Sequence, residues 1–179
     1  MPLALKSWFV ELGIEPNRVT ELDWWQGASG DNLTVHATPS QHWSGRSLWD
    51  RFETLWASYV IDIGDWRIWF GGDTGYNKVQ FKEIGAQFGP VDLALNPVGA
   101  YMPRWFMSMP HADPYEATLM HRDIGAKQSV TMHWGAFQLA AEGIQQTLDD
   151  IEAARRRSGL SAAEFQIMAV GETQRFTEN

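Results

Sequence analysis

The chain has 179 residues, which is enough for one domain with a buried core. Its formal net charge of -8 argues against a nucleic-acid partner, because phosphate backbones select surfaces rich in Lys and Arg. The absence of cysteine excludes disulfides, thiolate metal ligands and a cysteine nucleophile.

The first part of the chain predicts a helix followed by two strands. Residues 3–12 place apolar side chains near helical spacing, which predicts a helix. Lys6 and Glu11 interrupt this stretch, which has no basic start and no cleavage site and therefore does not resemble a signal peptide. No apolar run is long enough to cross a bilayer. The lack of cysteine fits a reducing compartment, so we expect a cytoplasmic protein, with peripheral membrane contact left open. Short strands are predicted at residues 19–25 and 32–38, and a loop at 40–53.

The middle of the chain predicts a hairpin and then an alternation of helix and strand. Alternating residues 55–63 and 66–70 flank the turn signal Gly64-Asp65, as in a β-hairpin. The GGDTG run at 71–75 ends this pattern. A helix at 79–88 and a buried strand at 91–95 follow, and then a long loop at 97–112 rich in proline and aromatic residues.

The last part of the chain predicts a capped helix and the end of the sheet. Asp113 is suited to cap a helix that runs to about Ile124, with Pro114 at the first helical position and Glu116 three residues after the cap. A strand at 129–133, an amphipathic helix at 144–158 and strands at 165–170 and 173–176 complete the order. This alternation predicts a single α/β domain over residues 1–179, with helices packed on a mixed sheet.

Three side chains that suit zinc follow predicted strands. His42 lies in TPSQHW, Asp73 in FGGDTGY and His133 in TMHWG. Sheets fix the backbone at strand ends and the adjoining loops leave an opening, so these residues are candidate zinc ligands. Each also has a structural interpretation, since a lone histidine often packs in a core and Asp73 could cap its turn.

The other histidines are less informative. For His111, which precedes the helix capped by Asp113, a structural and a functional role stay open. His36 and His121 lie inside predicted elements and are interpreted as structural. Ten tryptophans indicate a bulky core, although Trp43, Trp105 and Trp134, in turn-like segments beside His or Pro, favour an aromatic-lined pocket or an apolar contact surface.

Several segments of the chain together resemble a known family. TPSQHW, FGGDTGY, NPVGAYMPRWFM, HADPYEA and MHWGAF, in this order, resemble the metallo-β-lactamase superfamily, and within it the branch of N-acylphosphatidylethanolamine-hydrolysing phospholipase D. PLALKSWFVELGI and VTELDWW resemble that branch too, so the similarity covers almost the whole chain. The resemblance implies half of a four-layer αβ/βα sandwich.

The resemblance also implies roles for the matching positions. His42 would bind a first zinc ion, Asp73 would bridge two zinc ions and His133 would bind the second. Asp73 and His111 would act in catalysis. The substrate-binding site would be lined by Tyr101, Trp105, Phe106, His111 and Trp134. The implied reaction is hydrolysis of a phosphodiester, either phospholipid-like or another small molecule, by a metal-bound hydroxide.

One hallmark of the family does not occur in this sequence. The His-x-His-x-Asp-His cluster that supplies the remaining ligands is missing, and no histidine precedes His36. We therefore interpret the chain as the C-terminal half of such a hydrolase, with weak or partial zinc binding by itself and activity only in a completed site. The alternative is a catalytically inactive remnant or interaction module that keeps the fold. A half-sandwich leaves one sheet face uncovered, so we expect a homo-oligomer or association with an N-terminal half.

Overall fold

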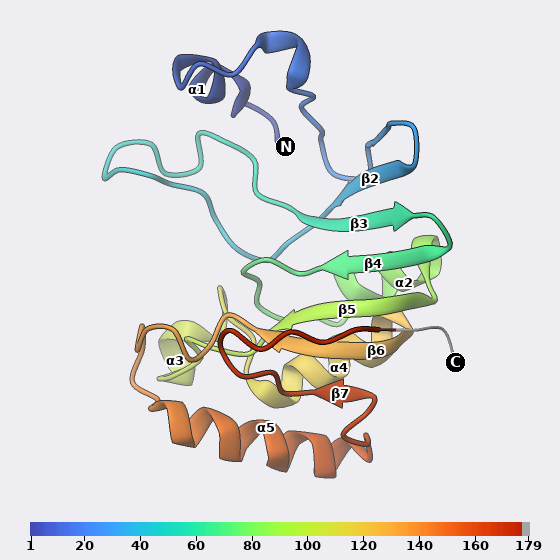
Figure 1. Ribbon diagram of the computed structural model, residues 1–179. Coiled ribbons are helices and arrows are strands. Elements are labelled where there is room, and N and C mark those ends of the chain that lie inside the picture. Colours follow the sequence, from blue (N-terminus) through green and yellow to red (C-terminus); the bar gives the residue numbers. More distant parts are fainter. Residues whose placement is uncertain (177–179) are drawn as a thin grey trace.

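A seven-stranded sheet forms the centre of the molecule (Figure 1), and its strands follow one another in chain order. The computed structural model describes residues 1–176. The strands are β1 (Gly27–Ser29), β2 (Leu33–Thr38), β3 (Ser58–Ile63), β4 (Trp66–Phe70), β5 (Val91–Pro97), β6 (Ala126–Met132) and β7 (Phe165–Gln166). Strands β1 to β4 pair antiparallel, and β4 to β7 pair parallel. This mixed sheet confirms the predicted α/β class.

Helices connect the parallel strands, as parallel pairing requires. In Figure 1, α2 and α4 lie behind the sheet and α5 runs beside the β7 edge. The helical segments are α1 (Lys6–Glu11), the 3-10 turn η1 (Pro16–Arg18), α2 (Gln80–Phe88), α3 (Arg104–Met107), α4 (Pro114–Ile124) and α5 (Ile144–Ser158). Among residues 1–176, no helix has the length and apolarity needed to cross a bilayer.

The main core lies between the sheet and the two helices behind it. Trp69 of β4 is fully buried and meets the ring of Phe81 of α2 edge to face, with centroids 5.9 Å apart. This cluster also contains Val60, Ile84, Phe88, Val91, Ala94, Ala112, Met120 and Ile124. Burial of each such side chain stabilises the fold by roughly 1.5–3 kcal/mol relative to leaving it exposed, so packing of these helices on the sheet contributes strongly to stability.

The predicted cap of the fourth helix is confirmed. The Asp113 carboxylate accepts a bond from the backbone N–H of Glu116 (2.8 Å), and the Glu116 carboxylate accepts one from the N–H of Asp113 (3.0 Å). This reciprocal pair satisfies two amide groups that have no partner within the helix. Gly125, at φ +73°, ends the helix in a left-handed conformation that costs glycine little. The start of α4, three residues after His111, is therefore fixed.

Three expected strands differ in the structure. Residues 19–25 form no strand, because Leu22 bonds to the carbonyl of Met1 and pairs with the N-terminal segment rather than with the sheet. The strand expected at 165–170 is reduced to β7, and 173–176 contain no strand. There the Glu172 carboxylate accepts the N–H of Ala169, so a local side-chain bond replaces a strand-to-strand one. The loop expected at 97–112 contains the short helix α3.

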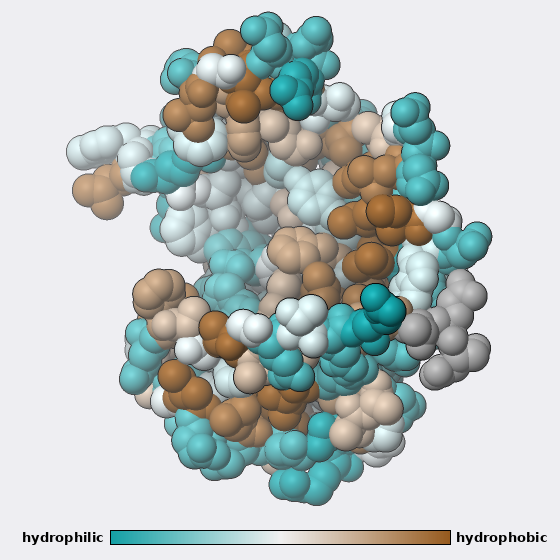
Figure 2. Space-filling view, in the orientation of Figure 1, coloured by the Kyte–Doolittle hydropathy of each residue, from teal (hydrophilic) through white to brown (hydrophobic). Residues whose placement is uncertain are grey.

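Within residues 1–176, no helix lies over the other face of the sheet in Figure 1. Leu33 and Ile63 are paired across β2 and β3, and Ile63 is paired with Trp66 across β3 and β4, so the three share this face. Leu33 and Ile63 are 41% and 45% exposed. Figure 2 shows the apolar side chains gathered over β2 to β4 on the side that faces the viewer. This surface is apolar and open, as expected for one half of a sandwich.

His121 of α4 makes the unfolding free energy depend on pH. It is 5% exposed, its Nδ1 lies 2.8 Å from the Ser129 hydroxyl, and burial lowers its pKa below the ordinary value. As pH falls below about 6.5, the unfolded chain binds a proton that the folded chain does not, so stability decreases until the folded pKa is reached. We expect His121→Asn to flatten this dependence in urea unfolding measured between pH 7.5 and 5. Equal pH slopes for the two proteins would contradict it.

Candidate metal centre

Four titratable side chains meet at one edge of the sheet, the edge formed by the C-terminal ends of β2, β4 and β6. His42, Asp73 and His133 follow β2, β4 and β6, and His111 lies between α3 and α4. The His111 ring centroid is 5.2 Å from that of His42 and 5.4 Å from that of His133. The structure thus brings together the three residues expected at strand ends and adds His111 to them.

His42 has one nitrogen held by the backbone and one that is free to bind. Its Nδ1 lies 2.9 Å from the carbonyl oxygen of Trp43, which can only accept a hydrogen bond, so Nδ1 carries the proton. Its Nε2 is buried and has no hydrogen-bond partner. The ring also stacks on Trp43, with centroids 5.7 Å apart and an interplanar angle of 8°. These contacts fix both the tautomer and the ring plane that a metal ligand needs.

Asp73 is held by the backbone turn that follows β4. Gly72 has a φ of +59°, which lets the chain turn tightly before Asp73. The hydroxyl of Ser40 donates to the Asp73 carbonyl (2.8 Å), and the N–H of Gln41 donates to the Thr74 hydroxyl (2.8 Å). The loop after β2 and the loop after β4 are therefore bonded together, which places Asp73 beside His42.

His133 is paired with the Asp73 carboxylate. Its Nε2 lies 3.2 Å from Asp73 Oδ1, and His42 Nε2 lies 3.9 Å from Asp73 Oδ2. The contact with Asp73 raises the pKa of His133, and the same contact lowers the pKa of Asp73 below its ordinary value. His133 has a φ of +61°, a strained value for a residue with a Cβ, and strain of this kind is common at functional sites.

His111 is fixed on both sides by its own loop. Its N–H donates to the carbonyl of Met107 (2.9 Å), and its carbonyl accepts a bond from Arg104 Nη1 (2.9 Å). Its Nδ1 is buried without a hydrogen-bond partner. Burial lowers the pKa of His111 to about 4, so the ring is neutral near pH 7 and its lone pair is available to a metal ion.

The expected substrate residues occupy different places. Trp105 and Phe106 of α3 are 85% and 64% exposed. Trp134 donates through Nε1 to the Thr131 hydroxyl (3.0 Å) and packs against the second core cluster. Tyr101 is only 3% exposed, and its hydroxyl donates to Asp150 of α5 (2.6 Å). Trp134 lines a small pocket together with His133, whereas Tyr101, Trp105 and Phe106 are not among the residues that line it.

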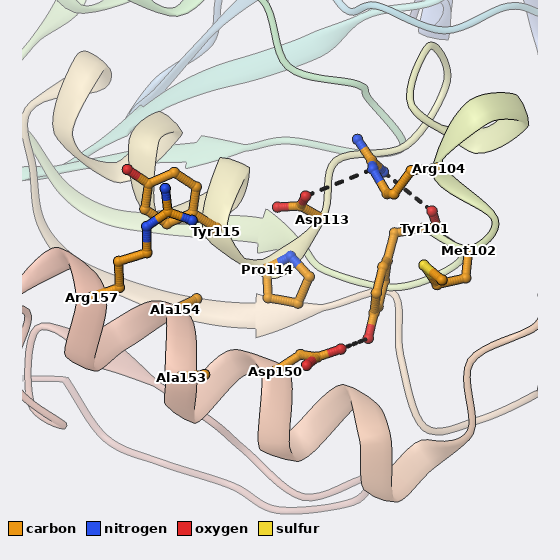
Figure 3. A pocket seen from close by; sticks show the side chains of 10 residues that line it. All are labelled: Tyr101, Met102, Arg104, Asp113, Pro114, Tyr115, Asp150, Ala153, Ala154 and Arg157. Atoms are coloured by element: carbon orange, nitrogen blue, oxygen red, sulfur yellow. Dashed lines mark hydrogen bonds and ion pairs between the residues drawn. The ribbon is translucent and has the colours of Figure 1, made fainter.

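Tyr101 instead lines a separate cavity of about 280 Å³ between α4 and α5 (Figure 3). Arg104 lies at one wall, where it bonds to the Tyr101 carbonyl (3.3 Å) and forms an ion pair with Asp113 (3.7 Å). Figure 3 shows the Tyr101 ring pointing from the loop toward Asp150. The lining residues are Tyr101, Met102, Arg104, Asp113, Pro114, Tyr115, Asp150, Ala153, Ala154 and Arg157.

Two supporting residues could not be found from the sequence pattern. Arg104 binds the His111 carbonyl and also the Glu116 carboxylate (2.7 Å), so it joins the loop to α4. Glu142 is 7% exposed and accepts the backbone N–H groups of Tyr101 and Met102 at 3.2 and 3.0 Å. Arg104 lies within the PRWFM segment and Glu142 within an irregular loop. Neither position carries a periodic signal, so only the folded chain reveals these contacts.

The residues present fit a divalent metal ion. One ligand atom each from His42, Asp73 and His111 lies within 4.8 Å of the other two. Unpartnered buried nitrogens are costly, and three of them belong to this cluster, one each on His42, His111 and His133. Neutral imidazoles and one carboxylate form a donor set typical of zinc.

Comparison with known proteins agrees with this geometry. Residues 2–134 match the profile of the family described as "Beta-lactamase superfamily domain". The chain is 40% identical over 146 residues to N-acyl-phosphatidylethanolamine-hydrolyzing phospholipase D 1 of Caenorhabditis elegans, covering 78% of this chain and 41% of that protein. It is 40% identical over 107 residues to the Outer membrane protein RomA of Klebsiella pneumoniae, covering 60% of this chain and 78% of that protein.

The fold is shared with solved structures. Igni18, a metallo hydrolase from Ignicoccus hospitalis, superposes with a TM-score of 0.63 at 23% identity, covering 96% of this chain and 66% of that one. The chain thus spans well under half the length of the phospholipase D relative and about two thirds of Igni18. N-acyl-phosphatidylethanolamine-hydrolysing phospholipase D is among the relatives of this chain. The chain belongs to the β-lactamase superfamily, as shown by the profile match over residues 2–134 together with the seven-stranded mixed sheet and the polar cluster at its edge.

Proposed function

We propose that this chain forms part of a zinc-dependent hydrolase that acts on a phosphodiester, with a phospholipid-like molecule as the substrate class. The observation that carries the proposal is the convergence of His42, Asp73, His111 and His133 at the edge of the sheet, with three buried nitrogens that lack partners. When bound, zinc supplies a Lewis acid for the phosphoryl oxygen and lowers the pKa of a bound water toward about 7.

The protein's own residues would position the metal and the substrate. By its resemblance to the family, His42 would bind one ion, Asp73 would bridge and His133 would bind a second ion. A complete two-metal site needs more ligands than this cluster supplies. We therefore propose that a partner, such as an N-terminal half, supplies the others, and that metal binding by this chain alone is weak.

The lipid-like substrate class is supported by apolar side chains beside the cluster. Trp105, Phe106 and Met109 are 85%, 64% and 52% exposed, and all lie within a few residues of His111. Phe137 and Leu139, in the loop that follows His133, are 79% and 67% exposed. Ala141 of that loop bonds to the Met102 carbonyl, so the two apolar loops are joined. Exposed apolar patches of this kind mark contact with lipid or protein.

Hydrolysis of bis(p-nitrophenyl) phosphate, a generic phosphodiester, tests the reaction. We expect turnover that requires zinc, stops with a chelator and is lost in His133→Ala, because the proposed site then lacks a ligand. Turnover that survives either treatment would count against zinc chemistry. Zinc binding with no turnover would favour the alternative function, an interaction module that retains the fold.

The oligomeric state follows from the open sheet face. Leu33, Ile63 and Phe70 are 41%, 45% and 39% exposed, and exposing such side chains to water costs roughly 25 cal/mol per Å². We expect the purified chain to self-associate at micromolar concentration, as measured by light scattering. We also expect Ile63→Glu to shift the population toward monomer, because a buried carboxylate at the interface would lose its hydration.

A charge change on the covered side is the matched control for that measurement. Gln87 is an exposed residue of α2, behind the sheet, and Gln87→Glu adds the same single negative charge and should leave the association unchanged. A monodisperse monomer of the unaltered chain would contradict the expected association.

A further inference from the structure

We propose that the cavity between α4 and α5 binds a small amphiphile, a molecule with an apolar body and one carboxylate or phosphate group, and that Arg157 binds the charged group. The cavity has a volume of about 280 Å³, near the lower end of the roughly 300–1,000 Å³ typical of small-molecule sites. None of the four residues of the metal cluster lines it. The proposed site is therefore separate from the metal cluster and does not depend on metal binding.

The wall of the cavity suits the apolar body of such a ligand. Pro114, at the first position of α4, has no backbone N–H, so it adds no unpaired donor to the wall. Figure 3 shows Pro114 between the rings of Tyr101 and Tyr115. On the α5 side the wall is formed by Ala153 and Ala154, whose small side chains leave the space open. Apolar groups gain free energy when they leave water for a surface of this kind.

Three other charged groups at the cavity already have partners in the protein. Arg104 forms ion pairs with Asp113 (3.7 Å) and with Glu116 of α4 (2.7 Å). The Asp113 carboxylate also accepts the backbone N–H of Glu116 (2.8 Å). The Asp150 carboxylate accepts the hydroxyl of Tyr101 (2.6 Å). The charge of Arg104 is thus balanced within the protein, and both aspartates have polar partners.

Arg157 is different, because it forms no ion pair within residues 1–176. Its guanidinium lies over the ring of Tyr115, 3.6 Å from the ring centroid. Figure 3 shows the side chain reaching from α5 to that ring at the cavity. A stacked guanidinium keeps its N–H groups in its own plane, where they can still donate. Such a planar group matches a carboxylate or a phosphate with two parallel hydrogen bonds, so an anion is the ligand group that this position favours.

The sequence of α5 explains why Arg157 has no counter-charge. Side chains three and four positions apart are neighbours on a helix. Glu152 stands three positions before Arg155 and four before Arg156, and it pairs with them at 2.6 and 3.9 Å. The residues at the same spacing before Arg157 are both alanines. These alanines provide the open space and also leave the arginine without a carboxylate on its own helix.

Titration of the unaltered chain with octanoate tests the site, with binding followed by ¹H–¹⁵N correlation spectra. A chelator is present throughout, because a bound metal ion could itself attract a carboxylate. We expect the amide signals of residues around the cavity to shift. Octanol and octylamine, which share the apolar body but lack the negative charge, should bind more weakly. Octyl phosphate shows which of the two anionic groups fits better.

Two results of this titration would overturn the inference. One is that neither octanoate nor octyl phosphate shifts the signals around the cavity. The other is that octylamine binds as tightly as both anions, since the aspartates and not Arg157 would then select the ligand.

A matched pair of arginine variants tests the role of the charge. Arg157→Gln removes the charge at an exposed position of α5 and keeps a polar side chain. We expect the Kd of the tighter-binding anion to increase more than about tenfold, because hydrogen bonds to charged groups are among the strongest in proteins. Arg156→Gln removes the same charge one residue away, at a side chain that is 72% exposed and does not line the cavity. This control should leave the Kd within about twofold, because charges on the surface are screened by salt. Equal increases in the two variants would overturn the inference.

Filling the cavity tests where the ligand lies. Ala153 is exposed on α5 and lines the cavity, so Ala153→Phe adds a ring there without crowding the buried core. We expect this variant to keep the circular dichroism spectrum of the unaltered chain and to lose binding of both octanoate and octanol. Unchanged octanoate binding in the folded variant would place the ligand elsewhere and overturn the inference.

Discussion

Asp73→Asn should weaken zinc binding by more than about 100-fold, because even residues that only orient a ligand cost 10–100-fold when changed. Asp73 is the only carboxylate in the ligand-forming group among the described residues, and it contacts both His42 and His133. The asparagine keeps the size of the side chain but removes the negative charge. Isothermal titration with zinc at pH 7 measures the change.

The control for Asp73 is a carboxylate of similar exposure to water but without these neighbours. Asp65 lies exposed in the turn between β3 and β4, and Asp65→Asn lowers the negative charge of the protein by the same amount. We expect its zinc affinity to equal that of the unaltered chain. Equal losses in the two variants would mean that zinc responds to overall charge rather than to the cluster.

Gly99→Ala should disrupt the site by pushing His133 away. Gly99 follows β5, and a Cβ at this position would lie 1.9 Å from the His133 carbonyl oxygen and 3.0 Å from its carbonyl carbon. Both atoms belong to the backbone, so the loop after β6 has to shift. We expect a loss of about 1–3 kcal/mol in the free energy of unfolding, as for other overpacked sites, together with weaker zinc binding. Urea unfolding and zinc titration measure the two effects.

Gly30→Ala is the matched control, since its added Cβ would come no closer than 4.0 Å to any other residue's atom. This substitution lies in the turn between β1 and β2, away from the cluster. We expect it to change stability by less than about 0.5 kcal/mol, as is usual for surface substitutions. Stability and zinc affinity that are the same for Gly99→Ala and Gly30→Ala would refute the close packing of the two loops.

Much of the fold could be predicted from local sequence. The hairpin around Gly64-Asp65 and the cap at Asp113 depend on turn and capping residues that act within a few positions. The helix Ile144–Ser158 matches its amphipathic pattern over its whole length. The strand predicted at 19–25 is wrong because this segment pairs with the N-terminal segment. That pairing is determined by tertiary contacts and not by the local sequence pattern.

The site was also predictable only in part, because some of its residues are placed by tertiary contacts. His42, Asp73 and His133 each follow a strand, so their residues can be located before the sheet is known. The place of His111 beside them depends on Arg104 and on the bonds of its loop, which no periodic pattern records. Glu142 binds Tyr101 and Met102 from 41 and 40 residues away, a contact made only by the folded chain.

Anomalous diffraction from crystals of this chain grown with zinc locates the ion most directly. The expected result is a zinc peak about 2.0–2.2 Å from His42 Nε2 and from a carboxylate oxygen of Asp73, with the peak missing in crystals of Asp73→Asn. A peak elsewhere on the protein, or no peak at this cluster at millimolar zinc, would contradict a metal centre at this edge of the sheet.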